Sequence, residues 1–146
     1  MSGKMRILVL CTGNSCRSQI AEGLFRHYGG GQVGVYSAGL EPKGVNPRAV
    51  QVMREIGIDI VGHTSDHLSQ YLERSFDFVI TVCDNAATNC PVFPGAATKL
   101  HWPFADPANA TGSEEEITAS FRSVRDHIEL TVKRWLSEAL GRGEGA

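Results

Sequence analysis

Hydrophobic positions in the chain fall into short continuous runs separated by longer, spaced stripes. Residues 5–10 form an almost wholly apolar run, which is typical of a strand buried on both faces. Further runs predict strands over residues 32–38, 76–82 and 98–102. We therefore expect four strands.

The stripes between these runs have the three- or four-residue spacing of amphipathic helices. One covers residues 19–28. Another starts at Asn46-Pro47, because proline fits the first helical position, and ends at Gly57. The longest helix begins after Ser113, a capping residue followed by three acids that complement the helix dipole. Its stripe steps through Ile117, Phe121, Val124, Ile128, Val132, Trp135 and Ala139.

Strands that alternate with helices predict an α/β protein with a parallel sheet between helical layers. We expect a three-layer sandwich around a central four-stranded parallel sheet. The length fits a single domain over residues 1–146. Residues 141–146 are expected to form a frayed tail.

The overall composition limits the classes of function. Hydrophobic residues make up 42% and charged residues 21% of the chain, as in a soluble globular protein, and the formal net charge is −2. This charge argues against a nucleic-acid-binding surface spread over the protein and leaves room for one small anion site. No apolar run approaches the roughly 20 residues of a membrane span, and residues 7–10 are too short for a signal-peptide core. We therefore expect a cytoplasmic protein without nucleic-acid or membrane partners.

Four cysteines, at positions 11, 16, 83 and 90, carry candidate chemistry. In a reducing cytosol they indicate redox chemistry, metal binding or packing rather than a fixed disulfide framework. If disulfides formed, three connectivities would be open, and the pattern alone does not choose between them. The spacing of Cys83 and Cys90, without a pair of histidines, is poor for zinc.

The loop after the first strand has the composition of an anion site. Cys11 ends the strand, small or polar residues follow, and Arg17 opens the next helix. This position presents free backbone N–H groups, and an arginine fork can hold a tetrahedral oxyanion over the Cys11 sulfur. The same groups favour the thiolate of Cys11 as a nucleophile, and Ser18 can donate a hydrogen bond to it. The oxyanion-binding residues are expected to be Thr12, Gly13, Asn14, Ser15, Cys16 and Arg17.

Residues 10–18 resemble the phosphate loop of low-molecular-weight protein tyrosine phosphatases, and more closely that of the arsenate reductases built on the same fold. The resemblance covers nearly the whole chain and implies a low-molecular-weight phosphatase-like fold. Other motifs that carry it are Tyr36-Ser37-Ala38-Gly39, Gly44-Val45-Asn46-Pro47, His63-Thr64-Ser65-Asp66, Cys83-Asp84, Asn89-Cys90-Pro91 and His101-Trp102-Pro103-Phe104-Ala105-Asp106-Pro107.

As an arsenate reductase, the chain would convert arsenate to arsenite through three of its cysteines. The resemblance implies that Cys11 attacks arsenate while Asp106 acts as general acid. Cys83 would then attack Cys11 and release arsenite, and Cys90 would carry the disulfide outward for reduction by thioredoxin. Residues 84–89 are small and polar without proline, which suits a segment that moves. Cys16, inside the loop, is expected to be a packed structural thiol.

The resemblance also implies a potassium site. Asn14, Glu22, Ser37 and Asp66 match residues that bind a monovalent cation in some of these reductases. Hard oxygen ligands beside the anion loop would fix its shape. No tightly bound cofactor is expected, and the protein is expected to be a monomer.

Two other functions share a cysteine after the first strand. A low-molecular-weight protein tyrosine phosphatase needs only Cys11, Arg17 and Asp106, since water resolves its phosphocysteine. Such phosphatases usually carry an aromatic residue beside the acid, whereas Pro107-Ala108-Asn109 follows Asp106 here. Ser15 stands where they often have a larger apolar residue. A phosphocysteine carrier domain of sugar transport would need neither Arg17 nor Asp106. We therefore expect arsenate reduction with weak phosphatase activity beside it.

Overall fold

The computed structural model describes residues 4–95 and 97–141, so the predicted frayed tail lies outside the described residues except for Gly141. The sheet has four parallel strands in the order β2-β1-β3-β4. They are β1 (Met5–Cys11), β2 (Val33–Gly39), β3 (Phe78–Thr81) and β4 (Thr98–His101). All four predicted strands are present, although β3 is shorter than the apolar run that predicted it.

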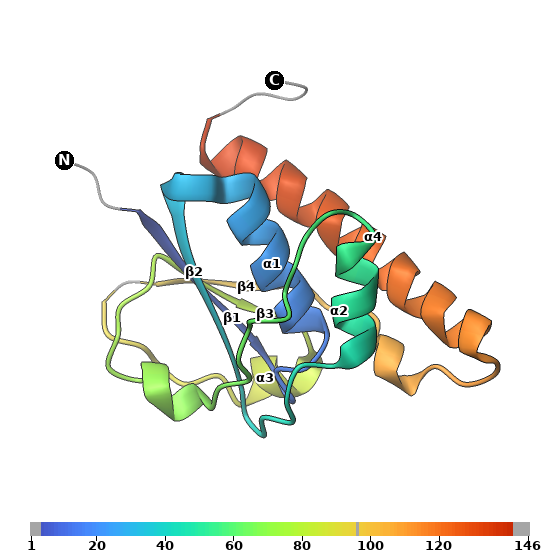
Figure 1. Cartoon of the computed structure of the whole chain (residues 1–146). Coiled ribbons are helices and arrows are strands. Elements are labelled where there is room, and N and C mark those ends of the chain that lie inside the picture. The colour runs from blue at the N-terminus through green and yellow to red at the C-terminus, as the bar shows by residue number, and fades with distance from the viewer. Residues whose placement is uncertain (1–3, 96, 142–146) are drawn as a thin grey trace.

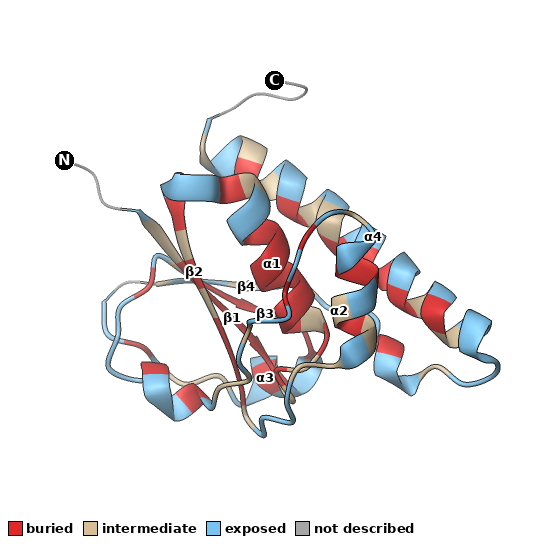
Figure 2. Ribbon diagram, in the orientation of Figure 1, coloured by how far each residue is buried: buried red, intermediate tan, exposed pale blue. Residues whose placement is uncertain are grey.

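Two helices, α1 (Arg17–Gly29) and α4 (Glu114–Ala139), cover one face of the sheet, and α2 (Pro47–Arg54) packs against α4 (Figure 1). Residues 18–25 of α1 are all buried, because this helix packs against β1 and β2 and also against α4 and α2 (Figure 2). The predicted capping of α4 is confirmed, since Ser113 forms a capping box at its first turn.

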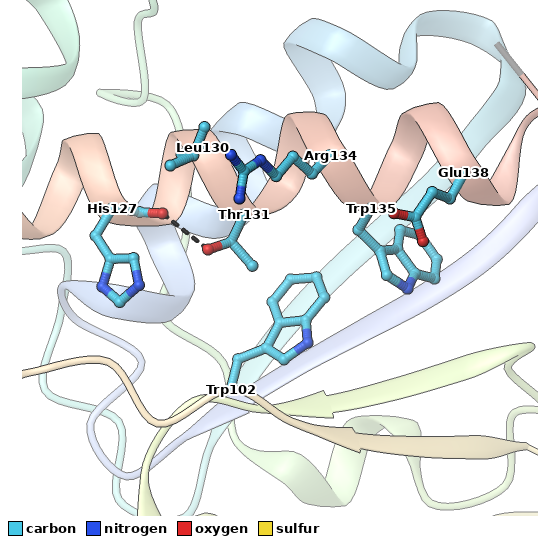
Figure 3. A pocket seen from close by; sticks show the side chains of 7 residues that line it. All are labelled: Trp102, His127, Leu130, Thr131, Arg134, Trp135 and Glu138. Carbon is cyan, nitrogen blue, oxygen red and sulfur yellow. Dashed lines mark hydrogen bonds between the residues drawn. The ribbon is translucent and has the colours of Figure 1, made fainter. Parts of the chain in front are cut away.

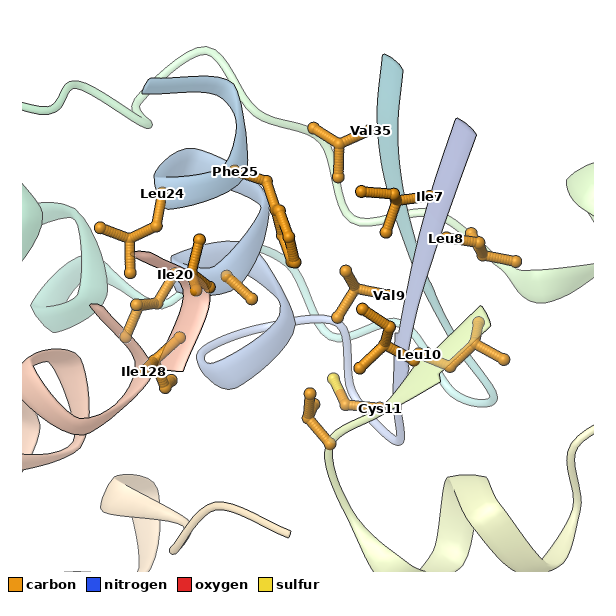
Figure 4. Packing of buried hydrophobic residues seen from close by; sticks show 14 of the residues in the cluster. Ile7, Leu8, Val9, Leu10, Cys11, Ile20, Leu24, Phe25, Val35 and Ile128 are labelled. Carbon is orange, nitrogen blue, oxygen red and sulfur yellow. The ribbon is translucent and has the colours of Figure 1, made fainter. Parts of the chain in front are cut away.

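The opposite face of the sheet has a thinner cover. In the register of β1 and β2, Tyr36 lies beside Leu8, whose side chain points away from α1 (Figure 4). Tyr36 belongs to a cluster of rings with centroids 5.8–6.2 Å apart, made of Tyr36, Tyr71, Phe76 and Phe93. A 3-10 turn over Leu68–Tyr71 supplies part of it. The third layer of the sandwich is therefore thin and is built in part from this 3-10 turn and the aromatic side chains beside it.

The carboxyl ends of β1 and β3 meet at one edge of the sheet, and a short helix, α3 (Asp84–Thr88), follows β3 there (Figure 1). The sequence indicated a mobile polar segment over residues 84–89, whereas the structure forms a five-residue helix. None of the helices in the described part of the chain is long and apolar enough to cross a membrane. This carboxyl edge is where the candidate chemistry gathers.

Candidate active site

The loop between β1 and α1 surrounds a hollow of about 310 Å³ at the carboxyl edge of the sheet. Cys11 ends β1 at the margin of the apolar core (Figure 4), and Arg17 begins α1. The hollow is lined by Cys11, Thr12, Gly13, Ser15, Cys16, Arg17, Lys43, Asp106 and Ala108. The residues predicted to bind an oxyanion thus line one hollow together, apart from Asn14, which lies buried beneath it.

Hydrogen bonds on the outer side of the loop orient its backbone. Three loop carbonyls accept N–H groups from the segment after β2 at 2.8–3.0 Å, in the pairs Thr12 with Glu41, Gly13 with Lys43, and Ser15 with Asn46. The C=O and N–H of a trans peptide point in opposite directions, so the N–H that follows each of these carbonyls faces away from that segment, and the N–H of Asn14 donates to the Cys11 sulfur. Gly39 permits this close packing, because a Cβ there would lie 2.6 Å from the Thr12 carbonyl oxygen.

Two donors converge on the Cys11 sulfur. Asn14 N donates to it at 3.1 Å, and Ser18 Oγ lies 2.9 Å away. The Asn14 side chain has a fixed orientation, because its Oδ1 accepts from the backbone N–H of Asp66 at 2.8 Å. Its Nδ2 therefore donates to Ser18 Oγ at 2.8 Å, which leaves the Ser18 proton free to point at Cys11. Hydrogen bonds of this kind favour the thiolate over the thiol.

Arg17 and Asp106 form an ion pair in the lining of the hollow. Arg17 Nη1 donates to the carbonyl oxygen of Phe104 at 3.1 Å, and its Nη2 lies 3.4 Å from Asp106 Oδ2. Asp106 Oδ1 accepts from the N–H of Ala108 at 3.0 Å, which holds the carboxyl group at the rim. The Asp106 side chain is 31% exposed, so an oxygen leaving the hollow can meet it. Proton donation by Asp106 at this rim is geometrically feasible.

Cys83 lies beside the anion loop, as its place after a neighbouring strand predicted. It is the N-cap of α3, where its Sγ accepts from the N–H of Ala86 at 3.4 Å. The same sulfur lies 3.4 Å from Thr12 Oγ1, and Thr12 directly follows Cys11. The two cysteines therefore stand on adjoining elements, and both are free thiols.

Cys90 stands apart from Cys83, beyond the far end of α3. It is half-buried, and burial raises the pKa of its thiol. Helix α3 lies between the two cysteines, since Cys83 is its N-cap and Cys90 follows its C-cap, Asn89. Both are free thiols, so a bond between them needs the intervening segment to rearrange.

Cys16 is a packed thiol, as expected. It is 5% exposed and packs against Val52 and Phe121 beneath α4. Burial raises its pKa to about 11, although a hydrogen bond with Ser15 opposes the shift. Cys16 thus remains protonated at neutral pH and is a poor nucleophile.

Three of the four predicted potassium ligands form one hydrogen-bonded chain. Asn14 Nδ2 donates to Ser37 Oγ at 2.9 Å, and Ser37 Oγ donates to Glu22 Oε1 at 2.5 Å. Arg26 donates twice to the other Glu22 oxygen, at 2.8 and 3.0 Å, while Asp66 presents its backbone N–H rather than its carboxylate to Asn14. As they lie, these groups do not fit a cation, because Asn14 turns its nitrogen inward and Arg26 already neutralises Glu22. The potassium site stays a prediction, and no reaction step is derived through it.

Lys43 belongs to the site and was not found from the sequence. It lines the hollow, and its Cδ would lie 3.5 Å from a Cβ at Gly13. Only the backbone pairing of the loop with the segment after β2 brings Lys43 there, and no local pattern in the sequence signals that pairing. Its ammonium adds positive charge at the mouth of an anion site.

A second hollow, also of about 310 Å³, lies between the end of β4 and α4 (Figure 3). It is lined by Trp102, His127, Leu130, Thr131, Arg134, Trp135 and Glu138. It contains none of the residues that the sequence marks as catalytic, so the candidate chemistry remains at the anion loop.

Comparison with known proteins gives the same assignment. Residues 6–144 match the family described as low molecular weight phosphotyrosine protein phosphatase. An arsenate reductase of Halalkalibacterium halodurans is 52% identical over 130 residues, which cover 89% of this chain and 94% of that protein. A solved structure of an arsenate reductase in the oxidized state aligns with a TM-score of 0.76 and 31% identity, over 91% of this chain and 97% of the other. A thioredoxin-dependent arsenate reductase of Corynebacterium glutamicum aligns with a TM-score of 0.70 and 29% identity, over 97% of this chain and 65% of the other. The chain therefore belongs to the low-molecular-weight phosphotyrosine protein phosphatase family, on the branch that contains the arsenate reductases.

Proposed function

We propose that the protein reduces arsenate to arsenite through Cys11, Cys83 and Cys90. The observation that carries this proposal is the place of Cys83, whose sulfur lies 3.4 Å from Thr12 Oγ1 beside the loop that holds Cys11. Phosphate-ester hydrolysis needs one cysteine, whereas arsenate reduction needs two electrons, and a second thiol beside the first can supply them. The relatives named arsenate reductase support this choice over the phosphatase alternative. A weak phosphatase activity would accompany it, because the loop suits either oxyanion.

In the first step the loop N–H groups and Arg17 bind the arsenate oxygens, with arsenic above the Cys11 sulfur. The Cys11 thiolate, held by Ser18 and the Asn14 N–H, forms a sulfur–arsenic bond. A hydroxyl group of the arsenate takes a proton from Asp106 and leaves as water.

In the second step the Cys83 thiolate attacks the Cys11 sulfur. A disulfide forms as the sulfur–arsenic bond breaks, and the bonding pair stays on arsenic. Arsenic passes from the +5 to the +3 state and leaves as arsenite, while the two sulfurs are oxidised. The Cys83 sulfur is held beside the loop, because it accepts from the N–H of Ala86 at 3.4 Å and lies 3.4 Å from Thr12 Oγ1.

In the third step Cys90 attacks Cys83 and frees Cys11 as a thiolate. The Cys83–Cys90 disulfide requires α3 to unwind, which takes the bond away from the hollow. Thioredoxin is the proposed reductant, since an accessible internal disulfide suits a dithiol donor and the Corynebacterium glutamicum neighbour is thioredoxin-dependent. The relay needs reduced thiols between turnovers, so we place the protein in the cytoplasm. We also propose that it acts as a monomer.

Consumption of NADPH by the protein with thioredoxin, thioredoxin reductase and arsenate tests this function, each component being omitted in turn. We expect steady turnover that needs both arsenate and thioredoxin. A Cys83→Ser variant should lose this turnover and keep aryl-phosphate hydrolysis. Absent turnover beside brisk aryl-phosphate hydrolysis by the unsubstituted protein would overturn the proposal in favour of a phosphatase.

A further inference from the structure

We propose that Asn85 and Asn89 are positioning residues, which turn the hydroxyl proton of Thr12 toward Cys83 and thereby keep the second cysteine reactive. The inference rests on the proposed function, because it assumes that Cys83 acts as a nucleophile. It extends that function to two exposed side chains at α3 that do not line the hollow.

The orientation of both amides follows from one backbone group. Asn89 donates from Nδ2 to the carbonyl oxygen of Asn85 at 3.0 Å and to its side-chain Oδ1 at 2.9 Å. A backbone carbonyl can only accept, so the Asn89 atom at this point is its NH₂ group. The Asn85 side-chain atom that meets the same NH₂ group is then its oxygen. The Asn85 nitrogen must face the other way, toward the anion loop.

That nitrogen sets the direction of the next hydrogen bond. Asn85 Nδ2 donates to Thr12 Oγ1 at 3.0 Å. A threonine hydroxyl has a single proton, and with its oxygen accepting from Asn85 this proton is free for its other neighbour, Cys83 Sγ at 3.4 Å. Without Asn85, the hydroxyl would serve equally well as acceptor for the Cys83 thiol. The asparagine pair therefore selects the arrangement in which Thr12 donates and the Cys83 thiolate accepts.

A similar chain of hydrogen bonds orients the donor at Cys11. There the Asp66 N–H orients Asn14, Asn14 donates to Ser18, and the Ser18 proton points at Cys11. The network at Cys11 is buried, whereas Asn85 and Asn89 are exposed and move with α3. Unwinding of α3 separates the pair from Thr12, so the donor at Cys83 exists only before Cys83 has reacted.

A thiolate titration tests the proposal without arsenate. In a Cys11→Ser, Cys90→Ser background, the thiols left are Cys83 and Cys16, and the pKa of Cys16 near 11 separates its signal. We expect Thr12→Val, which removes the hydrogen bond to the sulfur, to move the midpoint of the Cys83 thiolate absorbance upward by about one pH unit, and Thr12→Ser to restore it. Asn85→Ala removes only the group that orients the Thr12 hydroxyl, so it should move the midpoint in the same direction by a smaller amount.

A double-substitution cycle separates positioning from a general effect on the helix. Because Asn85 acts through Thr12, adding Asn85→Ala to Thr12→Val should change nothing further. Thr88→Ala, on α3 but without a hydrogen bond to the loop among the described residues, is the matched control and should leave the midpoint in place. An unchanged midpoint in Asn85→Ala, or an equal shift with and without Thr12, would overturn the proposal.

The result of this titration is independent of whether the protein reduces arsenate. A protein that fails to reduce arsenate can still show the Asn85 shift, and an arsenate reductase can show none. In single-turnover experiments on protein that keeps all four cysteines, Asn85→Ala should slow arsenite release near neutral pH about threefold to tenfold. The rate should recover at high pH, where the thiolate forms without help. A slow release at every pH would show a structural defect instead.

Discussion

Ser18→Ala removes one hydrogen bond from the nucleophile, Cys11, and leaves one buried donor without an acceptor. Ser18 is fully buried, its Oγ lies 2.9 Å from Cys11 Sγ, and the same oxygen accepts from Asn14 Nδ2 at 2.8 Å. After the change the sulfur keeps only the Asn14 backbone N–H. One of the two Asn14 amide protons loses its partner, while the other stays on Ser37.

Both effects have a definite size. A buried donor without a partner costs about 1–3 kcal/mol of folding free energy. At roughly 2.1 cal/mol/K of unfolding entropy per residue, the 146-residue chain should then lose about 3–10 °C in Tm. A hydrogen bond to a charged group is worth about 1.5–3 kcal/mol, so the acid limb of the kcat/KM profile should move upward by about one to two pH units.

Calorimetry and a pH profile of arsenate reduction separate these effects, with Ser37→Ala as the control. Ser37 is also buried and takes the second Asn14 amide proton at 2.9 Å, but its hydroxyl donates to Glu22 rather than to Cys11. Ser37→Ala should lower Tm to a similar degree and leave the acid limb in place. Coinciding pH profiles for the two variants would refute the assignment of Ser18 as the donor to the nucleophile.

Three further predictions concern charge. Lys43 lines the hollow and attracts the arsenate anion, so Lys43→Met should lower kcat/KM for arsenate about threefold to tenfold at low salt and less at high salt. An equal loss in the control variant Lys133→Met, on α4, would contradict this role of Lys43. Arg26 neutralises Glu22, the acid of the predicted cation site, so exchange of sodium for potassium should leave Tm unchanged in the native chain and raise it in Arg26→Ala. A rise of Tm with potassium in the native chain would instead favour the predicted site. Hydrogen bonds from Arg122, then Arg125, lower the pKa of Glu55 to about 2. The stability gained from these ion pairs is fully present above pH 4.5, the ordinary pKa of this carboxyl group, and is lost as the pH falls toward 2. Glu55→Gln should therefore reduce the dependence of stability on pH between these values. An unchanged plot of the urea unfolding midpoint against pH would contradict this prediction.

The sequence could predict those elements that depend on hydrophobic periodicity. Strand β1 and helix α4 appear as expected, because a short apolar run that ends in turn-forming residues favours a buried strand, and a long stripe after a Ser113 cap favours a helix. Helix α3 was not predicted, since its five residues carry no apolar stripe. The Cys83 cap and tertiary contacts with Thr12 hold it instead.

The candidate site divides in the same way. The anion loop is contiguous in sequence, so the residues from Cys11 to Arg17 could be found from their spacing together with the predicted strand before them, the predicted helix after them and the small residues between. Lys43 and Asn85 reach the loop only through tertiary hydrogen bonds, which leave no local pattern. Arg26 did have a signal, because it follows Glu22 by four residues on one helix, the spacing of an ion pair.

The most direct test of the central claim is a single turnover of the Cys90→Ser protein with arsenate and without thioredoxin. Arsenite is counted, and the disulfide is located by mass analysis of peptides under non-reducing conditions. We expect one equivalent of arsenite per protein and a disulfide between Cys11 and Cys83, because Cys90 acts only after arsenite has left. Arsenite without that disulfide, or a disulfide that involves Cys16, would contradict the relay.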